Sequence, residues 1–201
     1  MAIKFQFNKT SLGDLDKQLK MRTKALPTIK SKESALRVEV KSAKDMVVWF
    51  DREIERLSGS YHYMMPLWSE FDPSLLSIKD VNITETKIAG VRVPASGEVI
   101  FEQKDYDLFG SPLWIADGIS ILKEFASLNI EREIYVRKME LLDWARKKTT
   151  QKVNLYEKVQ IPGYEDAIRK IKRFLEDEEN LSKSAQKIVK TRQEAATDGM
   201  L

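Results

Sequence analysis

Cysteine is absent from this chain of 201 residues, and histidine occurs only once, at His62. Without cysteine there can be no disulfide scaffold and no thiolate metal site, and one histidine is too few for an HExxH zinc site. Histidine-based catalytic triads are equally disfavoured, and none of the eight scattered glycines opens a GxxxxGK or GxGxxG motif. The sequence therefore predicts no catalytic residue, no cofactor-binding residue and no metal site.

Long apolar runs are also missing. No stretch approaches the roughly 18 apolar residues that span a bilayer, and the opening MAIKFQFNKT lacks the apolar centre of a signal peptide. Charged residues make up 32% of the chain, which suits an elongated body with a large solvated surface. We therefore expect a protein that is neither exported nor inserted in a membrane.

The chain does contain a long apolar ladder. Between residues 12 and 64, apolar residues recur at alternating steps of three and four, and only Arg22 and Glu33 interrupt them. This is the spacing of a coiled coil, which keeps its seam facing a partner helix by supercoiling in the left-handed sense. The members of the ladder are Leu12, Leu15, Leu19, Leu26, Ile29, Leu36, Val40, Ala43, Val47, Phe50, Ile54, Leu57, Tyr61 and Met64.

The same rhythm returns in the second half of the chain. It runs from Ile121 to Tyr156, is broken at Pro162 and Gly163, and resumes in a second phase that ends at Val189. Two long helices joined by a folded connection must run antiparallel if they pair within one chain. The sequence predicts a mainly α protein, a long antiparallel left-handed two-helix coiled coil.

Capping and breaking signals suggest where the helices begin and end. Ser11 and Asp14 have the spacing of a capping box, which predicts a first helix from Ser11 to about Trp68. Pro27 should kink this helix without ending it, because the ladder continues in phase beyond it. Serine and proline at 111 and 112 predict the start of the second helix, with a bend near Pro162. The two prolines are expected to face positions near 173 and 38 of the opposite helix.

The middle of the chain has a different composition. Short runs of β-branched and aromatic residues between 81 and 101 are separated by Pro94-Ala95-Ser96-Gly97, which has the composition of a turn. They predict a small β-hairpin head that lies on the helices or on a partner protein. The expected domains are an N-terminal long helix (1–70), a hairpin-containing head (71–110) and a C-terminal long helix (111–201).

Charge is unevenly distributed along the chain. Residues 1–44 contain 11 Lys and Arg against 4 Asp and Glu, a net charge of +7, whereas residues 69–110 contain 4 against 8, a net charge of −4. The basic stretch is either the solvated flank of a coiled coil or an electropositive tip that meets a negative partner. The acidic rim of the head is a candidate docking surface.

Several stretches resemble one protein family. TTQKVN at 149–154, followed by Ile161-Pro162 and an amphipathic run with acidic residues, is similar to the signature of the D subunits of V-type and archaeal-type rotary ATPases. IAGVRVP at 88–94 and the basic, leucine-rich opening NKTSLGDLDKQLKMRTKAL resemble other segments of that family. Helix, hairpin and helix follow one another in the family's order, and the chain looks like a bacterial member.

This resemblance implies a central-stalk rotor protein without catalytic activity, in a peripheral sector at the cytoplasmic face of the membrane. The family's coiled coil stands in the bore of a hexamer of catalytic A and B subunits. Its lower part binds the small F subunit and a funnel-shaped subunit above the membrane ring. ATP hydrolysis or synthesis in the hexamer is thereby coupled to proton or sodium translocation.

Two sets of residues are candidate partner contacts. The basic residues expected to face the hexamer are Lys17, Lys20, Arg22, Lys24, Lys30, Lys152, Arg169, Lys172 and Arg173. The residues expected to form a foot that binds the small F subunit or the funnel-shaped one are Lys87, Ile88, Val91, Arg92, Val93, Val99 and Phe101.

Two other functions remain open from the residues alone. A free-standing coiled-coil adaptor or tether would need the same ladder but not the TTQKVN and Ile-Pro motifs. A basic coiled coil that binds nucleic acid would show steep salt dependence, although residues 9–44 contain no aromatic side chain on which bases could stack.

Overall fold

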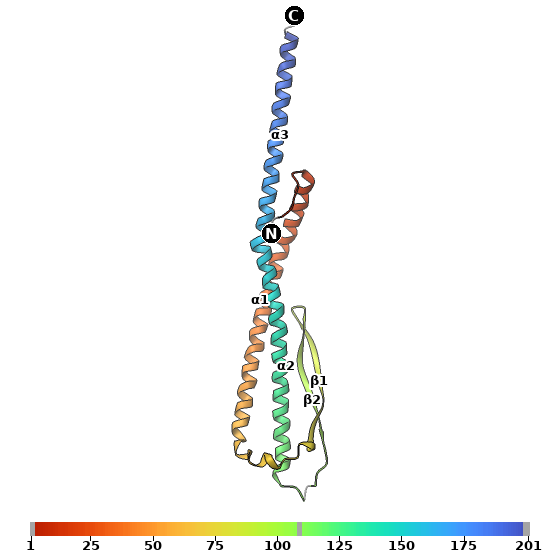
Figure 1. The fold of residues 1–201 in the computed structure, drawn as a ribbon, viewed down its shortest axis with the longest axis vertical. Coiled ribbons are helices and arrows are strands. Elements are labelled where there is room, and N and C mark those ends of the chain that lie inside the picture. The colour runs from red at the N-terminus through yellow and green to blue at the C-terminus, as the bar shows by residue number, and fades with distance from the viewer. Residues whose placement is uncertain (1–2, 108–109, 199–201) are drawn as a thin grey trace. The chain divides into compact units, whose positions relative to one another are not determined.

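The computed structural model describes residues 3–107 and 110–198. It is mainly helical, with a two-stranded antiparallel hairpin between two long helical stretches, which confirms the predicted fold class (Figure 1). Two compact units are formed, one by Met1–Ser31 with Thr150–Leu201 and the other by Lys32–Thr149. Each unit has its own apolar core.

Helix α1 spans Lys9–Ser60 and contains Pro27 without ending there, as predicted. The predicted N-cap at Ser11 is wrong, and the cap lies about one turn earlier in the chain. The side-chain oxygen of Asn8 accepts a hydrogen bond from the backbone N–H of Ser11 at 2.7 Å. The Ser11 hydroxyl in turn accepts the backbone N–H of Gln6 at 3.3 Å. Asn8 therefore acts as the N-cap, and Ser11 reaches back to the residues that precede the helix.

In the first unit, ladder residues of the two helical stretches form the core. Leu15 of α1 packs against Ala167, Ile168 and Ile171 of α3, which spans Ile161–Asp198. The partly buried residues around this core are Ile3, Phe5, Leu12, Leu19, Tyr164 and Leu175. The N-terminal segment thus folds onto α3.

Because Gly163 has no side chain, Ile3 of the N-terminal segment can pack closely against α3 there. A Cβ atom at residue 163 would lie 3.0 Å from the Cδ1 of Ile3. Further along the segment, the ring of Phe7 lies 4.9 Å from the ring of Phe174, measured between centroids. The Pro162-Gly163 pair, which the sequence indicates as a helix break, is therefore also a packing site for the N-terminus.

In the second unit, Leu36 of α1 and Leu142 of α2 are fully buried together with Val93 of the hairpin. Helix α2 spans Trp114–Asn154. The rings of Phe50 and Tyr135 are 5.4 Å apart, which continues the seam along the helices. Burial of these ladder residues confirms the coiled-coil pattern.

Strands β1 (Leu76–Ile88) and β2 (Val91–Gln103) form the hairpin. Its turn is Ala89-Gly90, both at positive φ, and the turn predicted at residues 94–97 is wrong. Those residues lie inside β2, opposite a register irregularity between Ile83 and Glu85. A two-residue turn with both φ values positive matches the twist of the strands, so a tight turn can form there although Ala89 has a Cβ.

Three short 3₁₀ helices connect α1 to the hairpin, at His62–Met64, Leu67–Glu70 and Pro73–Leu75. The α-helix thus ends eight residues before the predicted end at Trp68. Trp68 packs edge-on against Trp114, with ring centroids 5.5 Å apart. Helix α2 begins at Trp114 rather than at the predicted Pro112. The backbone N–H of Ile115, in the first turn of α2, donates to the carbonyl of Pro112.

The second helical stretch contains a π-helical turn, η4 (Leu155–Gln160), between α2 and α3. The backbone N–H of Ile161 donates to the carbonyl of Tyr156, five residues back. Pro162 explains this locally, because its missing N–H and its ring cannot fit the four-residue hydrogen-bond ladder. The bend near Pro162 stays a prediction, and the irregularity that the structure has there is this π-helical turn.

The pairing between the two helical stretches differs from the expected alignment. Within the first unit, Arg22 bonds to Gln160 and Lys30 to Glu157. Pro27 lies between Arg22 and Lys30, so it faces η4 and not position 173. Pro162 lies level with the turn of α1 before Arg22 and not with position 38. The alignment is shifted because α3 extends past the start of α1 (Figure 1).

Candidate interaction surfaces

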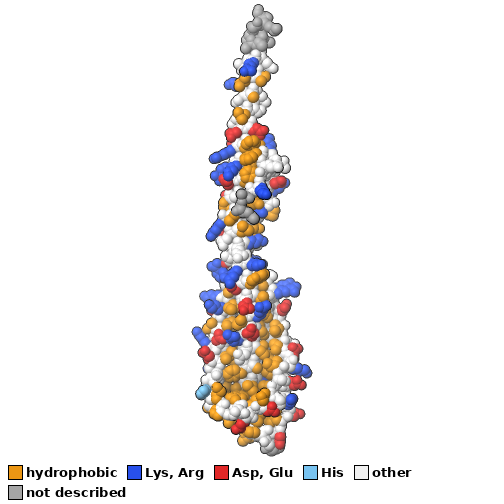
Figure 2. Space-filling model, in the orientation of Figure 1, with side chains coloured by type: hydrophobic (Ala, Val, Ile, Leu, Met, Phe, Trp, Pro, Cys, Tyr) orange, Lys and Arg blue, Asp and Glu red, His pale blue; other side chains and the backbone are white. Residues whose placement is uncertain are grey.

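Eight of the nine basic residues proposed to face the hexamer are exposed. Lys17, Lys20, Lys24 and Lys30 lie on α1, Lys152 lies on α2, and Arg169, Lys172 and Arg173 lie on α3. Figure 2 shows Lys and Arg side chains at several places on the visible face of the molecule. The exposed members form the candidate interaction surface of the first unit.

Arg22, the ninth residue, faces its own coiled coil and is half-buried. Its guanidinium donates to Gln160 at 2.7 Å and to Gln18 on its own helix, and it lies 4.7 Å from the ring centroid of Tyr164. The polar break in the apolar ladder at Arg22 is thus filled by a polar and aromatic layer. Arg22 belongs to the seam between helices and not to the outer surface.

Some of the exposed lysines have carboxylate neighbours. Lys30 pairs with Glu157 at 2.7 Å, while Lys17 and Lys20 each lie 4.0 Å from an aspartate on their own helix. All six side chains are between 44% and 81% exposed. Exposed ion pairs contribute only about 0 to 1 kcal/mol each. These pairs can therefore be exchanged for contacts with a partner.

The hairpin residues proposed as a foot divide into three groups. Val93 is 1% exposed and packs with Leu36 and Leu142, so it serves the protein's own core and cannot present its side chain to a partner. The half-buried residues are Ile88, Val91, Val99 and Phe101. Only Lys87 and Arg92 are exposed.

Lys87 and Arg92 are direct cross-strand partners in the hairpin register. They flank the Ala89-Gly90 turn, and the Nζ atom of Lys32 lies 3.6 Å from where a Cβ on Gly90 would be. The tip of the hairpin is therefore basic, although its sequence region is acidic overall. Like charges placed opposite each other destabilise a strand pair unless a counter-charge offsets them.

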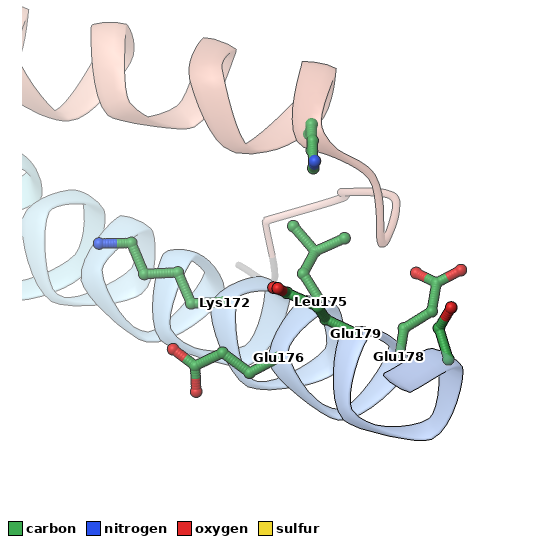
Figure 3. Close-up of a pocket in the computed structure, with 7 residues that line it drawn as sticks. Lys172, Leu175, Glu176, Glu178 and Glu179 are labelled. Atoms are coloured by element: carbon green, nitrogen blue, oxygen red, sulfur yellow. The ribbon is translucent and has the colours of Figure 1, made fainter. Parts of the chain in front are cut away.

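An open groove of about 580 Å³ lies where α3 passes the start of α1. Figure 3 shows Leu175 pointing towards α1 and Glu176 projecting away from it. The pKa of Glu179 is lowered by its hydrogen bond and ion pair with Lys183, and more weakly by Lys9. Within the described residues, no group of three His, Asp or Glu side chains is placed to hold a metal ion.

Sequence reasoning missed two surfaces. The first is formed by Ile3, Phe5 and Phe7, which pack on α3 although they precede the ladder. The second is the exposed indole of Trp144, with the Nζ of Lys148 lying 4.5 Å from its ring centroid. The one sequence signal for an outward Trp144 is its spacing from the seam. It lies two residues after the buried Leu142, and helical residues two apart do not share a face.

Fold and surfaces together define a class: a protein of two long, antiparallel, paired helical stretches that carries a β-hairpin between them. No described helix is both long enough and apolar enough to cross a bilayer.

Residues 11–191 match the sequence model of the family described as the ATP synthase D subunit. The chain is 30% identical over 190 residues to the V-type ATP synthase D subunit of Borreliella burgdorferi, and the match covers 94% of each chain. It is 29% identical to the protein of the same name from Chlamydia muridarum, over 88% of this chain and 90% of that one. The chain belongs to the family of ATP synthase D subunits.

Proposed function

We propose that this chain is the central rotor shaft of a V/A-type ATPase, a non-catalytic component of the peripheral sector on the cytoplasmic face of the membrane. The observation that carries this function is the family match over residues 11–191. An antiparallel helix pair with an apolar core in each of its two units also suits the task. Sliding one helix along the other would expose several buried side chains at once, so the pair can transmit torque.

The exposed basic residues of the first unit contact the bore of the A/B hexamer. Exposed ion pairs are individually weak and are screened by salt, so they can be exchanged as the shaft turns. Lys24, Lys172 and Arg173 are all exposed. Arg22 holds the helix pair together instead and does not take part in this contact.

Assembly tests the proposal directly. This chain is co-expressed with the A, B and F subunits of the same organism, and the complex is isolated through a tag on A and weighed by native mass spectrometry. The expected result is one copy of this chain per A/B hexamer. If the chain never co-purifies and remains free, the shaft function is refuted and an adaptor or tether becomes the better explanation.

Charge reversal tests the basic surface. Lys24→Glu, Lys172→Glu and Arg173→Glu are combined, and ATP hydrolysis is measured together with ion transport in reconstituted vesicles. We expect fewer ions moved per ATP with assembly retained. Lys41→Glu, Lys44→Glu and Lys79→Glu form a matched control of exposed lysines in the second unit. If the two triple variants move the same number of ions per ATP, Lys24, Lys172 and Arg173 do not form the contact with the hexamer.

The basic tip of the hairpin contacts an acidic surface of the small F subunit or of the funnel-shaped one. Lys87 and Arg92 face each other across the strands, and an acidic partner offsets their repulsion. Lys87→Glu with Arg92→Glu should weaken binding to that partner in a pull-down assay. Glu98→Lys, exposed on the same strand as Arg92, is the control. Unchanged binding to both partners would overturn the contact.

A further inference from the structure

The second helical stretch has one residue too many for a regular coiled-coil seam. Tyr156 is half-buried and Ile171 is fully buried, and both lie on the side that faces α1. They are fifteen residues apart in the sequence. Four steps that alternate between four and three residues cover only fourteen. One extra residue must therefore be taken up between these two positions.

The π-helical turn η4 (Leu155–Gln160) takes up this residue. A π-helix bonds each N–H to the carbonyl five residues back, so it holds more residues per turn than an α-helix. In a regular α-helix, Tyr164 would lie about 80° around the axis from Tyr156. The wider turn reduces this angle. The guanidinium carbon of Arg22 lies 5.9 Å from the ring centroid of Tyr156 and 4.7 Å from that of Tyr164.

Pro162 accounts for an interruption of the helix, but it does not decide which side chain faces α1. Gln160 and Ile161 are neighbours just before this proline, and both are half-buried. Ile161 is the better seam residue by composition, because an apolar side chain gains free energy on burial. It is nevertheless the side-chain oxygen of Gln160 that accepts a hydrogen bond from the Nε of Arg22, at 2.7 Å.

Arg22 is held in place by its own helix. Its Nη1 donates to the side-chain oxygen of Gln18 at 2.5 Å and to the backbone carbonyl of Gln18 at 3.1 Å. With Nε bonded to Gln160 as well, the guanidinium has a fixed direction. Arg22 is one of only two polar steps in the ladder of α1. A single polar residue in an apolar seam specifies one alignment of the helices at a cost in stability.

We propose that Arg22 is a positioning residue that fixes the π-helical turn in one place. It selects Gln160 over Ile161 as the residue that faces α1, and so keeps the extra residue between Tyr156 and Gln160. With an apolar side chain at position 22, the turn shifts so that Ile161 enters the seam. This inference does not rest on the rotor function, because it concerns the packing of the chain's own helices.

Hydrogen bonds across η4 show where the extra residue lies. The N–H of Ile161 donates to the carbonyl of Tyr156, and NMR couplings through hydrogen bonds should detect this pair in the full chain. Arg22→Leu should abolish the coupling, because leucine favours Ile161 opposite it. Lys24→Leu is the control, since it makes a leucine at an exposed position of α1. A coupling that persists in Arg22→Leu would overturn the proposal.

A double variant tests whether Arg22 acts through Gln160. When Arg22→Leu is combined with Gln160→Leu, residue 160 is again suited to the layer between Tyr156 and Tyr164. The coupling between Ile161 and Tyr156 should therefore return, although both polar partners are gone. Circular dichroism of each variant checks that the helices remain. If the double variant does not recover the coupling, Arg22 does not select Gln160 and the proposal fails.

A variant that keeps Arg22 tests the same contact without weakening the seam. Gln160→Glu gives the guanidinium a charged acceptor, and charge-assisted hydrogen bonds are stronger than neutral ones. Exchange of the Ile161 amide with deuterated water should slow by about threefold or more at neutral pH. Gln151→Glu, at an exposed position of α2, is the control. Equal exchange in the two variants would mean that the contact with Arg22 does not hold η4.

Discussion

At the scale of single residues, a glycine inside β2 decides how closely the hairpin lies on α2. A Cβ atom at Gly97 would stand 2.8 Å from the Cδ1 of Ile134 and 3.2 Å from the Cγ1 of Val81. Ile134 is buried, so it has little freedom to move away. The composition around residue 97 indicates a turn, yet the glycine is there because its neighbours leave no space for a side chain.

Gly97→Val should lower the free energy of unfolding by about 1–3 kcal/mol, as overpacking of a dense core does. Urea denaturation followed by circular dichroism measures the change. Gly13→Ala is the matched control, because no atom lies within 4 Å of the added methyl group and alanine favours a helix. A Gly97→Val protein as stable as the native one would show that the hairpin is free to lift from α2.

Asp143 should give the protein a measurable acid sensitivity. Hydrogen bonds from Lys147 and Arg146 hold the pKa of its carboxyl below the usual value. A lowered pKa in the folded state adds stability above the unfolded pKa of about 4, and this stability is lost as pH falls through the folded pKa. Asp143→Asn should therefore be less stable than the native protein near neutral pH.

Denaturation curves of both proteins between neutral pH and about pH 2 test this, because the difference should shrink as the carboxyl of Asp143 is protonated. A difference that stays constant over the whole range would mean that Asp143 acts through packing and not through charge.

At the scale of elements, the hairpin turn carries local strain. Ala89 has a φ of 48°, in the left-handed region that disfavours residues with a Cβ. Ala89→Gly should raise the free energy of unfolding by about 0.5–1 kcal/mol, because the relief of strain exceeds the added entropy of the unfolded chain. Ala95→Gly, in a strand without positive φ, should lower it. Thermal denaturation that shows both variants destabilised would contradict this account.

Pro27 is the corresponding feature of α1. It removes one backbone hydrogen bond in a helix that is otherwise continuous from Lys9 to Ser60. Pro27→Ala restores the donor and should stabilise the protein by about 1–3 kcal/mol, measured by urea denaturation. Loss of stability would show instead that η4 on the opposite helix is shaped to fit the proline.

At the scale of the whole molecule, the exposed basic residues should make assembly depend on salt. Screening lengths fall from about 10 Å at 0.1 M salt to about 3 Å at 1 M, so the binding to the A/B hexamer that we propose should weaken as salt rises. The triple reversal at Lys24, Lys172 and Arg173 should reduce that slope. Binding that strengthens with salt would mean that apolar contacts dominate the interface.

Local patterns predicted the helices and the hairpin well. The three-four ladder predicted which side chains enter the seam, and Leu15, Leu36, Phe50, Leu142 and Ile171 are buried as expected. It also showed that Pro27 does not end α1. The pattern could not predict the alignment of the two stretches, because any shift by whole heptads preserves an a/d seam.

The candidate surfaces were less predictable than the fold. Arg22 and Lys24 have the same charge and lie two residues apart, but one faces the seam and the other faces solvent. Their roles depend on Gln160 and Tyr164, which are more than a hundred residues away along the chain. Whether Val93 faces the core or a partner likewise depends on the hairpin register, which the sequence does not give.

The sequence by itself determined the periodic helices, the hairpin composition, the family and the distribution of charge, because these depend only on the order of residues along the chain. The tertiary structure decided the Ala89-Gly90 turn, the π-helical turn before Pro162, the docking of Ile3 over Gly163 and the bare end of α3. These features depend on distances between residues remote in the chain, which packing fixes and local spacing leaves open.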